Sequence, residues 1–380
     1  MSRLVLIASL MRFQGETGVQ THVRAVHDWL VQQGRSVQLV TPFNCSVWQV
    51  YPLFGLRRLL DRINKTASVW WYRYWHSVFL QHALAKQLSD GRPCSIYAQS
   101  PLSARAALRA RRTRAQKVVM VVHFNLSQAD EWVDKGAISR EGSLYHSIQA
   151  FEEKILPDVD ALVFVSKFMQ RELLRRIPSL QRVVSRVIPN FIDDPGEPVT
   201  RAELYDLITI GTLEYRKNQR YALEIIHAAG RLGHALSLTV VGEGPDRSLL
   251  EKLARELNIE KQIRFMGFVS HAAELMAQHR ACLHVAHMEN LPLTLIEALS
   301  RGLPVFSPDA GGMPEVFDDG VEGRLIPLED AQAAARVILE CLDDEALMRR
   351  AKGAARSRFL NYFEANRVAT KLVGFLDGVT

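Results

Sequence analysis

The segment His287–Gly302, with the sequence HMENLPLTLIEALSRG, combines a helix start with two glutamates seven residues apart. Pro292 has a fixed φ and no amide hydrogen, which suits the first position of a helix, and Gly302 suits the position after its end. The residues between them are good helix formers, so we predict one helix over residues 292–301. The apolar run Ala281–Ala286 precedes this segment and predicts a short buried strand.

This order of strand, loop and helix places both glutamates near one point. Glu289 lies in the loop, and Glu297 lies about one and a half turns into the helix. The first amides of a helix lack partners and carry partial positive charge, so we expect phosphate there, while a carboxylate binds sugar hydroxyls. Phosphate and hydroxyls together indicate a nucleotide sugar as the ligand.

Further motifs follow the two glutamates in a fixed order. They are LPVFS at 303–307, AGGMPEV at 310–316, DG at 319–320 and GRLI at 323–326. With the E-x7-E element they resemble the retaining glycosyltransferases of family 4. The resemblance implies an α/β protein of the GT-B fold, in which two doubly wound, Rossmann-like parallel sheets face a central cleft. A lone pair of glutamates would indicate only a solvated helix face, but the ordered context favours a ligand site.

The length of 380 residues fits two domains, and strands alternate with helical patterns in both halves. The resemblance and the exposed segment DDPGEP at 193–198 give the expected boundaries. These are an acceptor-side domain at 1–192, a linker at 193–204, a nucleotide-sugar domain at 205–355 and a helix at 356–380 that crosses back to the first domain. The expected strands are Val5–Leu10, Val37–Thr41, Ser95–Gln99, Val118–His123 and Ala161–Ser166, then Asp206–Gly211, Leu238–Gly242, Ile263–Gly267, Leu283–Val285 and Val305–Phe306.

The resemblance assigns the donor-binding residues of the second domain. The loop GTLEYRKN at 211–218 resembles the family's diphosphate loop, and Lys217 falls at the family's lysine. Thr212 stands where arginine is usual, so we expect Arg216 to supply the missing cation; the alternative is a surface pair at a helix start. The resemblance also implies that Met266 lies beside the nucleobase, that Glu297 binds the ribose hydroxyls, and that the donor contacts the helix-start residues Asn290, Leu291, Pro292 and Leu293.

The resemblance also assigns two site residues of the first domain, and a role in catalysis to Glu289 of the second. Gly18, in TGVQTH at 17–22, resembles the loop that closes on the donor phosphates, although Thr17 replaces the first glycine of the family's pair. His123 ends an expected strand and matches the family's histidine near the transferred sugar; the alternative is a structural histidine. Glu289 is implied to orient the sugar hydroxyls and the diphosphate. We therefore take Glu289 and His123 as the catalytic candidates.

A metal ion is not expected. Asp158-Val159-Asp160 has the letters of a metal-binding DxD element, but it directly precedes a buried strand, and Asp160 matches a structural position of the family. The charge on the leaving phosphate would instead meet Arg216, Lys217 and the helix dipole. We expect no cofactor beyond the nucleotide-sugar co-substrate.

Positive charge is concentrated in the N-terminal third of the chain. Residues 1–120 contain 17 Lys and Arg against 4 Asp and Glu, a net of +13. Trp and Tyr interleave with Arg between 48 and 75, which suits the interface of an anionic membrane. A single-stranded nucleic acid is the competing partner, but no nucleic-acid motif accompanies these residues, so none is expected. A solvated basic helix whose tryptophans pack inward is the remaining alternative.

The expected function is transfer of a hexose-type sugar from a UDP- or GDP-sugar to a glycan or lipid-linked acceptor, in cell-surface polysaccharide or lipopolysaccharide synthesis. Four widely spaced cysteines and an apolar start too short for a signal peptide favour a cytoplasmic protein, peripheral on the inner face of the cell membrane. A sugar-nucleotide epimerase and a nucleotide-sugar-binding protein without transferase activity remain alternatives. Thr17 and Thr212 keep the second of these open.

Overall fold

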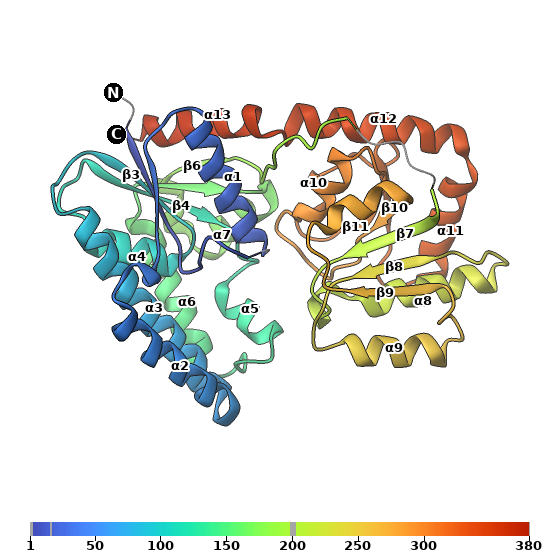
Figure 1. Cartoon of the computed structure of the whole chain (residues 1–380), viewed down its shortest axis with the longest axis horizontal. Helices are drawn as coiled ribbons and strands as arrows, with labels where there is room; N and C mark the ends of the chain where they lie inside the picture. The colour runs from blue at the N-terminus through green and yellow to red at the C-terminus, as the bar shows by residue number, and fades with distance from the viewer. Residues whose placement is uncertain (1–2, 16, 198–202, 380) are drawn as a thin grey trace. The chain divides into compact units, whose positions relative to one another are not determined.

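The computed structural model describes residues 3–15, 17–197 and 203–379, and it divides the chain into two compact units (Figure 1). The first unit comprises Met1–Asn190 with Ala365–Thr380, and the second comprises Phe191–Glu364. Within the described ranges, no helix combines the length and the apolar composition needed to cross a bilayer.

The first unit contains a six-stranded sheet in the order β2-β1-β3-β4-β5-β6, with every pair parallel. Its central strands are buried on both faces, which explains their continuous apolar sequence. The strands are β1 Leu4–Ala8, β2 Val37–Val40, β3 Cys94–Ala98, β4 Gln116–Val122, β5 Ala161–Phe164 and β6 Val184–Val187.

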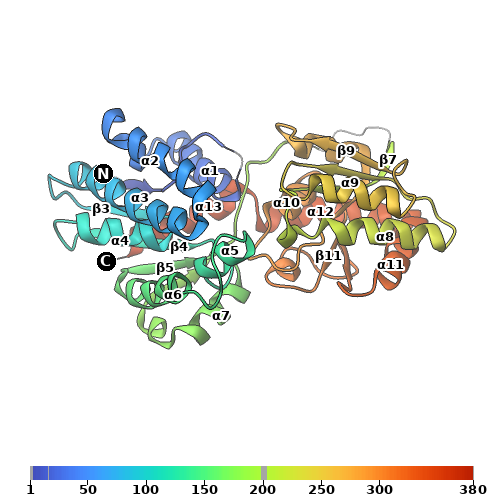
Figure 2. The same ribbon diagram turned by 90° about the horizontal axis from the view of Figure 1, so that it is seen from below.

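Eight α-helices belong to the described part of this unit: α1 Gly18–Gln32, α2 Val47–Ile63, α3 Lys65–Gln87, α4 Pro101–Ala110, α5 Gln128–Asp134, α6 Ser143–Ile155, α7 Lys167–Arg176 and α13 Ala365–Gly378. Helices α3, α4 and α6 lie on one side of the sheet and α13 on the other (Figure 2). The Trp29 Nε1 donates to Asn366 Oδ1 at 3.0 Å, and Arg35 pairs with Asp377 at 2.7 Å, so α13 is fastened to this unit.

The second unit also contains six parallel strands, in the order β12-β11-β10-β7-β8-β9. The strands are β7 Tyr205–Ile210, β8 Leu238–Val241, β9 Ile263–Gly267, β10 His279–Leu283, β11 Val305–Pro308 and β12 Gly323–Ile326. The helices are α8 Gln219–Arg231, α9 Arg247–Glu256, α10 Leu293–Ser300, α11 Ala331–Asp343 and α12 Glu345–Tyr362. Helices α8 and α9 cover one face, and α10 and α12 cover the other (Figure 2).

Strand order reverses between β7 and β10 in the second unit. From β7 the chain moves outward through β8 to β9, then returns to β10 on the other side of β7 and moves outward through β11 to β12. In doubly wound sheets, ligands bind at the carboxyl ends of the strands beside such a reversal. The loops that follow β7 and β10 are therefore where a ligand site is expected.

The observed boundaries differ from the expected ones at several points. The units divide at 190/191 and 364/365, and residues 198–202 of the expected linker lie outside the described residues. The expected crossing helix from 356 is two helices, since α12 ends at Tyr362 and only α13 belongs to the first unit. Ile192 N donates to Phe363 O at 3.3 Å, which places the break between these helices beside the start of the second unit.

The helix predicted over 292–301 is shorter by one residue at each end. Pro292 is its N-cap, with φ −71° and ψ 123°, and not its first helical residue. A proline ring fixes φ but leaves ψ free, so the sequence does not decide between the two positions. Strand β10 also begins and ends earlier than Ala281–Ala286, which leaves His284 in the loop that follows it.

Candidate functional site

Two glycine loops interlock at the carboxyl ends of β7 and β8. Leu213 N donates to Glu243 O at 3.0 Å, which ties the first loop to the second. A Cβ on Gly242 would lie 2.0 Å from Gly211 O, and one on Gly244 would lie 2.2 Å from Leu213 O. Only glycine allows this close backbone approach. The loop after β7 is therefore held in one position, together with the basic residues that follow it.

Those basic residues form a single 3₁₀ turn, Tyr215–Lys217, between β7 and α8. Asn218 ends the turn in the left-handed region, at φ 55° and ψ 35°, a conformation that asparagine tolerates better than most residues. His287 N, in the loop after β10, donates to Arg216 O at 3.0 Å. This backbone bond joins the loops on the two sides of the strand reversal.

The side chains of this turn meet Glu289. Lys217 Nζ forms an ion pair with Glu289 Oε1, and Arg216 Nη1 lies 3.6 Å from the same oxygen. The other terminal nitrogen of Arg216 donates to Glu214 Oε1 at 2.9 Å. Two cations and a carboxylate are thus gathered at the point where strand order reverses.

Glu289 is 8% exposed, and its charge is maintained by its neighbours. Burial alone would raise the pKa of Glu289, but Lys217, His284 and Arg216 together hold it well below its usual range. The His284 side chain is 3% exposed, and its Nε2 lies 3.6 Å from Glu289 Oε1. Glu289 is therefore a carboxylate at neutral pH and can accept hydrogen bonds from hydroxyl groups.

The AGG motif after β11 holds the backbone of Glu289. Gly312 N donates to Glu289 O at 2.8 Å. Gly311 has φ +64°, and a Cβ there would lie 2.2 Å from the same carbonyl oxygen. The two glycines thus let this loop pass directly against the residue that precedes α10.

Helix α10 directs its N-terminus into the same loop region. Its N-cap is Pro292, which supplies no side-chain cap, so the first-turn amides lack the usual capping oxygen. Asn290 and Leu291 are buried, Leu293 begins the helix, and Glu297 lies partly exposed in its second turn. Together with Glu289, these residues form the part of the candidate site that follows β10.

Met266 is the penultimate residue of β9 and is half-buried. Strand β8 separates β9 from β7 in the sheet, and Gly242 N donates to Gly267 O at 2.8 Å. Met266 therefore lies along the same carboxyl edge as the basic turn, two strands away from it.

The first unit holds the other catalytic candidate, His123, which follows β4. Its Nε2 lies 3.1 Å from Gln99 Oε1, and its ring stands edge-on to His22 at 4.6 Å between centroids. Burial, together with His22, lowers the pKa of His123 well below its usual value, and burial lowers that of His22 to about 4. Both imidazoles are neutral at neutral pH, so His123 can accept or donate a hydrogen bond without charge.

Gly18 is the exposed first residue of α1. Thr17 caps this helix with its own side chain, in a capping box with Gln20. Gln20 Nε2 also donates to Arg12 O at 2.9 Å and to Gln14 O at 2.6 Å. Gln20 therefore binds the backbone of Arg12 and Gln14 in addition to its part in the capping box, whereas the N-cap residue of α10 supplies no side-chain cap.

The Asp-Val-Asp element is structural at its second carboxylate. Asp160 Oδ2 accepts from Val118 N at 2.8 Å and from Arg111 at 2.9 Å. In the part of the chain that the structure describes, no three His, Cys, Asp or Glu residues are grouped to hold a metal ion.

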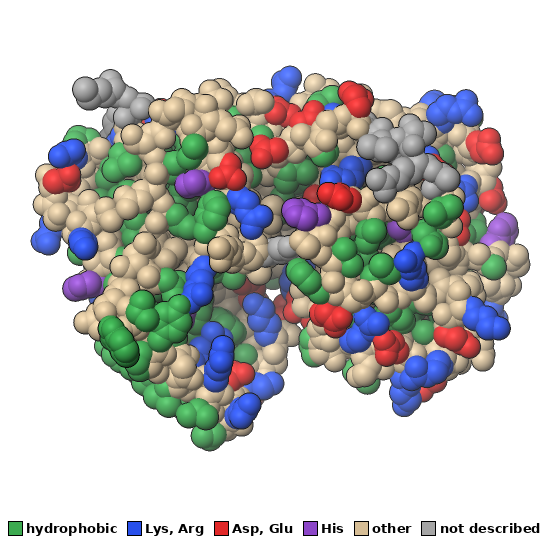
Figure 3. All heavy atoms as spheres, viewed as in Figure 1, with side chains coloured by type: hydrophobic (Ala, Val, Ile, Leu, Met, Phe, Trp, Pro, Cys, Tyr) green, Lys and Arg blue, Asp and Glu red, His purple; other side chains and the backbone are tan. Residues whose placement is uncertain are grey.

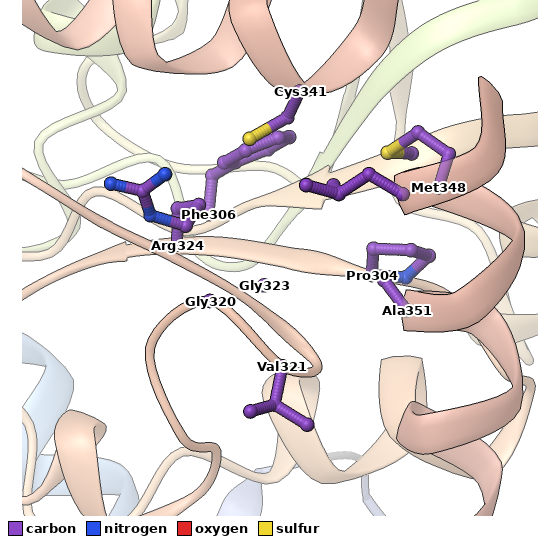
Figure 4. Close-up of a pocket in the computed structure, with 10 residues that line it drawn as sticks. Pro304, Phe306, Gly320, Val321, Gly323, Arg324, Cys341, Met348 and Ala351 are labelled. Atoms are coloured by element: carbon purple, nitrogen blue, oxygen red, sulfur yellow. The ribbon is translucent and has the colours of Figure 1, made fainter. Parts of the chain in front are cut away.

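A small pocket of the second unit lies away from these residues (Figure 4). Pro304 precedes β11, Gly320 and Val321 precede β12, and all three line the pocket, which therefore lies at the amino ends of these strands. Helices α11 and α12 contribute Cys341, Met348 and other mostly apolar side chains. Its position and its lining separate it from the basic turn and Glu289.

Comparison with known proteins follows the division of the chain. Residues 17–194 match the profile of Glycosyltransferase Family 4, and residues 193–358 match that of Glycosyl transferases group 1. The two matches together extend from residue 17 to residue 358. The chain belongs to glycosyltransferase family 4. It is thus a glycosyltransferase of the GT-B type.

Individual proteins resemble the chain over different lengths. Glycogen synthase of Mycobacterium tuberculosis is 29% identical over 287 residues, which are 73% of this chain and 67% of that protein. The N-acetylgalactosamine-N,N'-diacetylbacillosaminyl-diphospho-undecaprenol 4-alpha-N-acetylgalactosaminyltransferase of Campylobacter jejuni is 28% identical over 45% of this chain and 46% of its own. The crystal structure of Anabaena HepE in complex with UDP and glucose superposes with a TM-score of 0.71, at 15% identity, over the whole of both chains. This last similarity confirms the predicted fold class.

Three residues that the structure places at the candidate site were not assigned from the sequence. His284 stood within a run interpreted as a buried strand, and a polar residue in that apolar run was the available signal. Glu214 and Gly311 were visible in the quoted motifs. The ion pair of Glu214 with Arg216, two residues further on, depends on the conformation of the turn, and the contact of Gly311 with Glu289 depends on strands that are distant in sequence.

Proposed function

We propose that this glycosyltransferase moves a hexose-type sugar from a UDP- or GDP-sugar to an acceptor hydroxyl with retention of anomeric configuration. One observation carries the proposal: Lys217 and Arg216, after β7, converge on Glu289, after β10, at the reversal of strand order. This position is where doubly wound sheets bind nucleotides. The uncapped N-terminus of α10 adds backbone donors for phosphate oxygens.

The cations and the carboxylate bind different parts of the donor. The diphosphate binds Arg216, Lys217 and the first amides of α10, and Glu289 accepts hydrogen bonds from the sugar hydroxyls. Glu297 binds the ribose hydroxyls, and Met266 lies against the nucleobase. The neutral imidazole of His123 accepts a hydrogen bond from the transferred sugar, and Gly18 lets the loop before α1 approach the phosphates.

The reaction needs no covalent intermediate with the protein. The bond between the anomeric carbon and the β-phosphate oxygen breaks, and the acceptor oxygen bonds to the same face of the sugar. The acceptor's proton passes to the departing phosphate oxygen, which leaves nucleoside diphosphate and the glycosylated acceptor. Arg216 and Lys217 stabilise the charge that develops on that phosphate, so we propose that transfer requires no metal.

The acceptor is a glycan or a lipid-linked saccharide, used in cell-surface polysaccharide or lipopolysaccharide synthesis. The names of two relatives support this class, since one makes glycogen and the other acts on a diphospho-undecaprenol saccharide. The excess of Lys and Arg over residues 1–120 supports a cytoplasmic location of the protein, on the anionic inner face of the cell membrane.

A donor panel tests this proposal. The protein is incubated with UDP-, GDP-, ADP- and dTDP-sugars, with and without EDTA. Transfer of the sugar to water or to an acceptor is followed by the nucleoside diphosphate that it releases. We expect one UDP- or GDP-sugar to be cleaved equally well in EDTA, with retained configuration of the released sugar by NMR. Loss of cleavage in EDTA would contradict metal independence. Binding of a donor without any cleavage, with or without acceptor saccharides, would favour the non-catalytic alternative, and a sugar epimerised on the intact nucleotide would favour an epimerase.

A further inference from the structure

The outward face of α2 is apolar although it is exposed. Trp48, Leu59 and Ile63 are 88%, 56% and 82% exposed, and Pro52 and Leu56 between them are also exposed. Their spacing of four, four, three and four residues places all five on one side of the helix. Apolar side chains of this size, gathered on one solvent-facing helix surface, indicate a binding surface.

The opposite face of α2 already anchors the helix to α3. Val50 is 1% exposed, Phe54 stacks on His76 with centroids 3.9 Å apart, and Trp71 Nε1 donates to Leu53 O at 2.7 Å. The fold of the hairpin formed by α2 and α3 therefore uses the inward residues. The outward residues are much more exposed than Val50, so packing against α3 does not by itself explain their apolar character.

Basic side chains border the outward face. Arg58 and Arg62 each precede one of its apolar residues, and Lys65 begins α3; all three are exposed. Asp61 is the one acidic residue among residues 47–75, against five Lys and Arg. The space-filling view shows hydrophobic side chains with Lys and Arg beside them over the region of α2 and α3 (Figure 3). The surface thus offers apolar area and positive charge together.

We propose that this face of α2 binds the surface of an anionic phospholipid bilayer, with Trp48, Leu59 and Ile63 in the headgroup interface. Arg58, Arg62 and Lys65 then meet lipid phosphates. The proposal rests on the membrane-face function proposed above and names the element that makes the contact. Charge complementarity favours this occupant over an apolar protein partner. The aliphatic residues favour it over single-stranded nucleic acid, which binds basic grooves through aromatic stacking.

Vesicle flotation tests the surface directly. The full chain is floated with vesicles of phosphatidylcholine containing phosphatidylglycerol, and with phosphatidylcholine alone, at low and high salt. We expect flotation with the anionic vesicles only, weakened by salt. The triple variant Trp48→Gln, Leu59→Gln, Ile63→Gln should partition at least ~10-fold more weakly, because binding of such helices scales with the apolar area they bury.

Matched variants test whether flotation depends on this surface or on exposed apolar and basic residues in general. Val31, Val184 and Leu249 are comparably exposed elsewhere, and their triple change to Gln should float as wild type does. Arg58→Gln, Arg62→Gln and Lys65→Gln together should weaken flotation, whereas the same change at the exposed Arg92, Arg220 and Lys252 should not. Circular dichroism checks that each variant is folded.

Three results would overturn the proposal. They are wild-type flotation by the α2 apolar variant, equal flotation with neutral vesicles at all salt concentrations, and self-association of the chain that the same variant abolishes without any flotation. Donor cleavage in the absence of vesicles is measured in parallel. If the α2 variants lose flotation but cleave donor normally, the surface is supported. If wild type floats but no donor is cleaved, the proposed reaction fails and the membrane contact stands.

Discussion

Lys217 and Glu289 form an ion pair although 72 residues separate them in the chain. Each follows a different strand beside the reversal of strand order, and the side chains are only 15% and 10% exposed. The pair therefore exists only when β7 and β10 are adjacent. It also places a cation suited to phosphate beside a carboxylate suited to hydroxyl groups. A nucleotide sugar carries both kinds of group and needs both partners.

Removing Lys217 should affect both stability and donor use. Lys217→Met removes the cation that does most to stabilise the charge of the buried Glu289, so we expect a loss of about 1–3 kcal/mol in the free energy of unfolding. Urea denaturation measures this change. The matched change Lys252→Met removes an exposed pair with Glu256 and should cost at most ~0.5 kcal/mol. Equal losses in the two variants would contradict the structural role given to Lys217.

Gly311 should be needed for space and not only for its backbone conformation. Gly311→Ala would place a methyl group 2.2 Å from Glu289 O, whereas Gly320 has a similar positive φ with nothing within 4 Å of its Cβ. We expect Gly320→Ala to cost about 1 kcal/mol of strain and Gly311→Ala to cost about 1–3 kcal/mol more, with a marked loss of donor binding. Thermal unfolding and donor titration compare the two. Similar behaviour of both variants would show that the loop relaxes away from Glu289.

Acid should destabilise the first unit through its buried histidines. Burial lowers the pKa of His22 to about 4 from an ordinary value near 6.5, so the unfolded chain binds a proton more readily than the folded chain between these values. The free energy of unfolding is therefore unaffected by His22 above about pH 6.5. It falls by about 3 kcal/mol as the pH drops towards 4, because only the unfolded chain takes up the proton in this range. Burial of His76 acts in the same direction, lowering its pKa to about 3.

Denaturant unfolding across this pH range measures the effect. The variant His22→Gln should lose less stability than wild type as the pH falls, while His146→Gln, at an exposed position, should follow wild type. An unchanged pH dependence in His22→Gln would argue against a neutral buried imidazole at this position.

Glu297 should act on donor affinity more than on stability. Its side chain is only partly buried in the second turn of α10, so Glu297→Gln should leave the unfolding temperature nearly unchanged. Loss of a charged acceptor for the ribose hydroxyls should raise KM for the donor about 10- to 100-fold, with a smaller effect on kcat. The control Glu340→Gln alters an exposed glutamate of α11. A KM equal to that of this control would remove Glu297 from the proposed site.

The sequence predicted those features that depend on neighbours in the chain. The apolar runs of β4 and β8 and the strand-loop-helix order around Glu289 arise from local pattern, and the structure contains each of them. Strands β6 and β12 were not predicted as strands. β6 has only four residues, with an exposed valine and arginine among them, and β12 begins with a glycine, so neither presents the buried apolar run of a central strand.

Other features depend on contacts across the sheet and could not be predicted. The approach of Gly311 to Glu289 follows from the pairing of β10 with β11, which no local pattern encodes. At the boundary between α12 and α13, Phe363 O likewise accepts a hydrogen bond from Ile192 N, a residue distant in sequence. The resemblance gave Lys217 and Glu289 as separate assignments, but their ion pair needed the structure.

Binding of UDP and GDP to the isolated protein, measured by titration calorimetry in EDTA, tests the central claim most directly. The claim is that the basic turn after β7 binds the donor diphosphate without metal. We predict that one of the two nucleotides binds in EDTA, that Lys217→Met weakens this binding about 10- to 100-fold, and that Lys252→Met leaves it unchanged. Equal affinity of wild type and Lys217→Met, or binding only after a divalent ion is added, would contradict the claim.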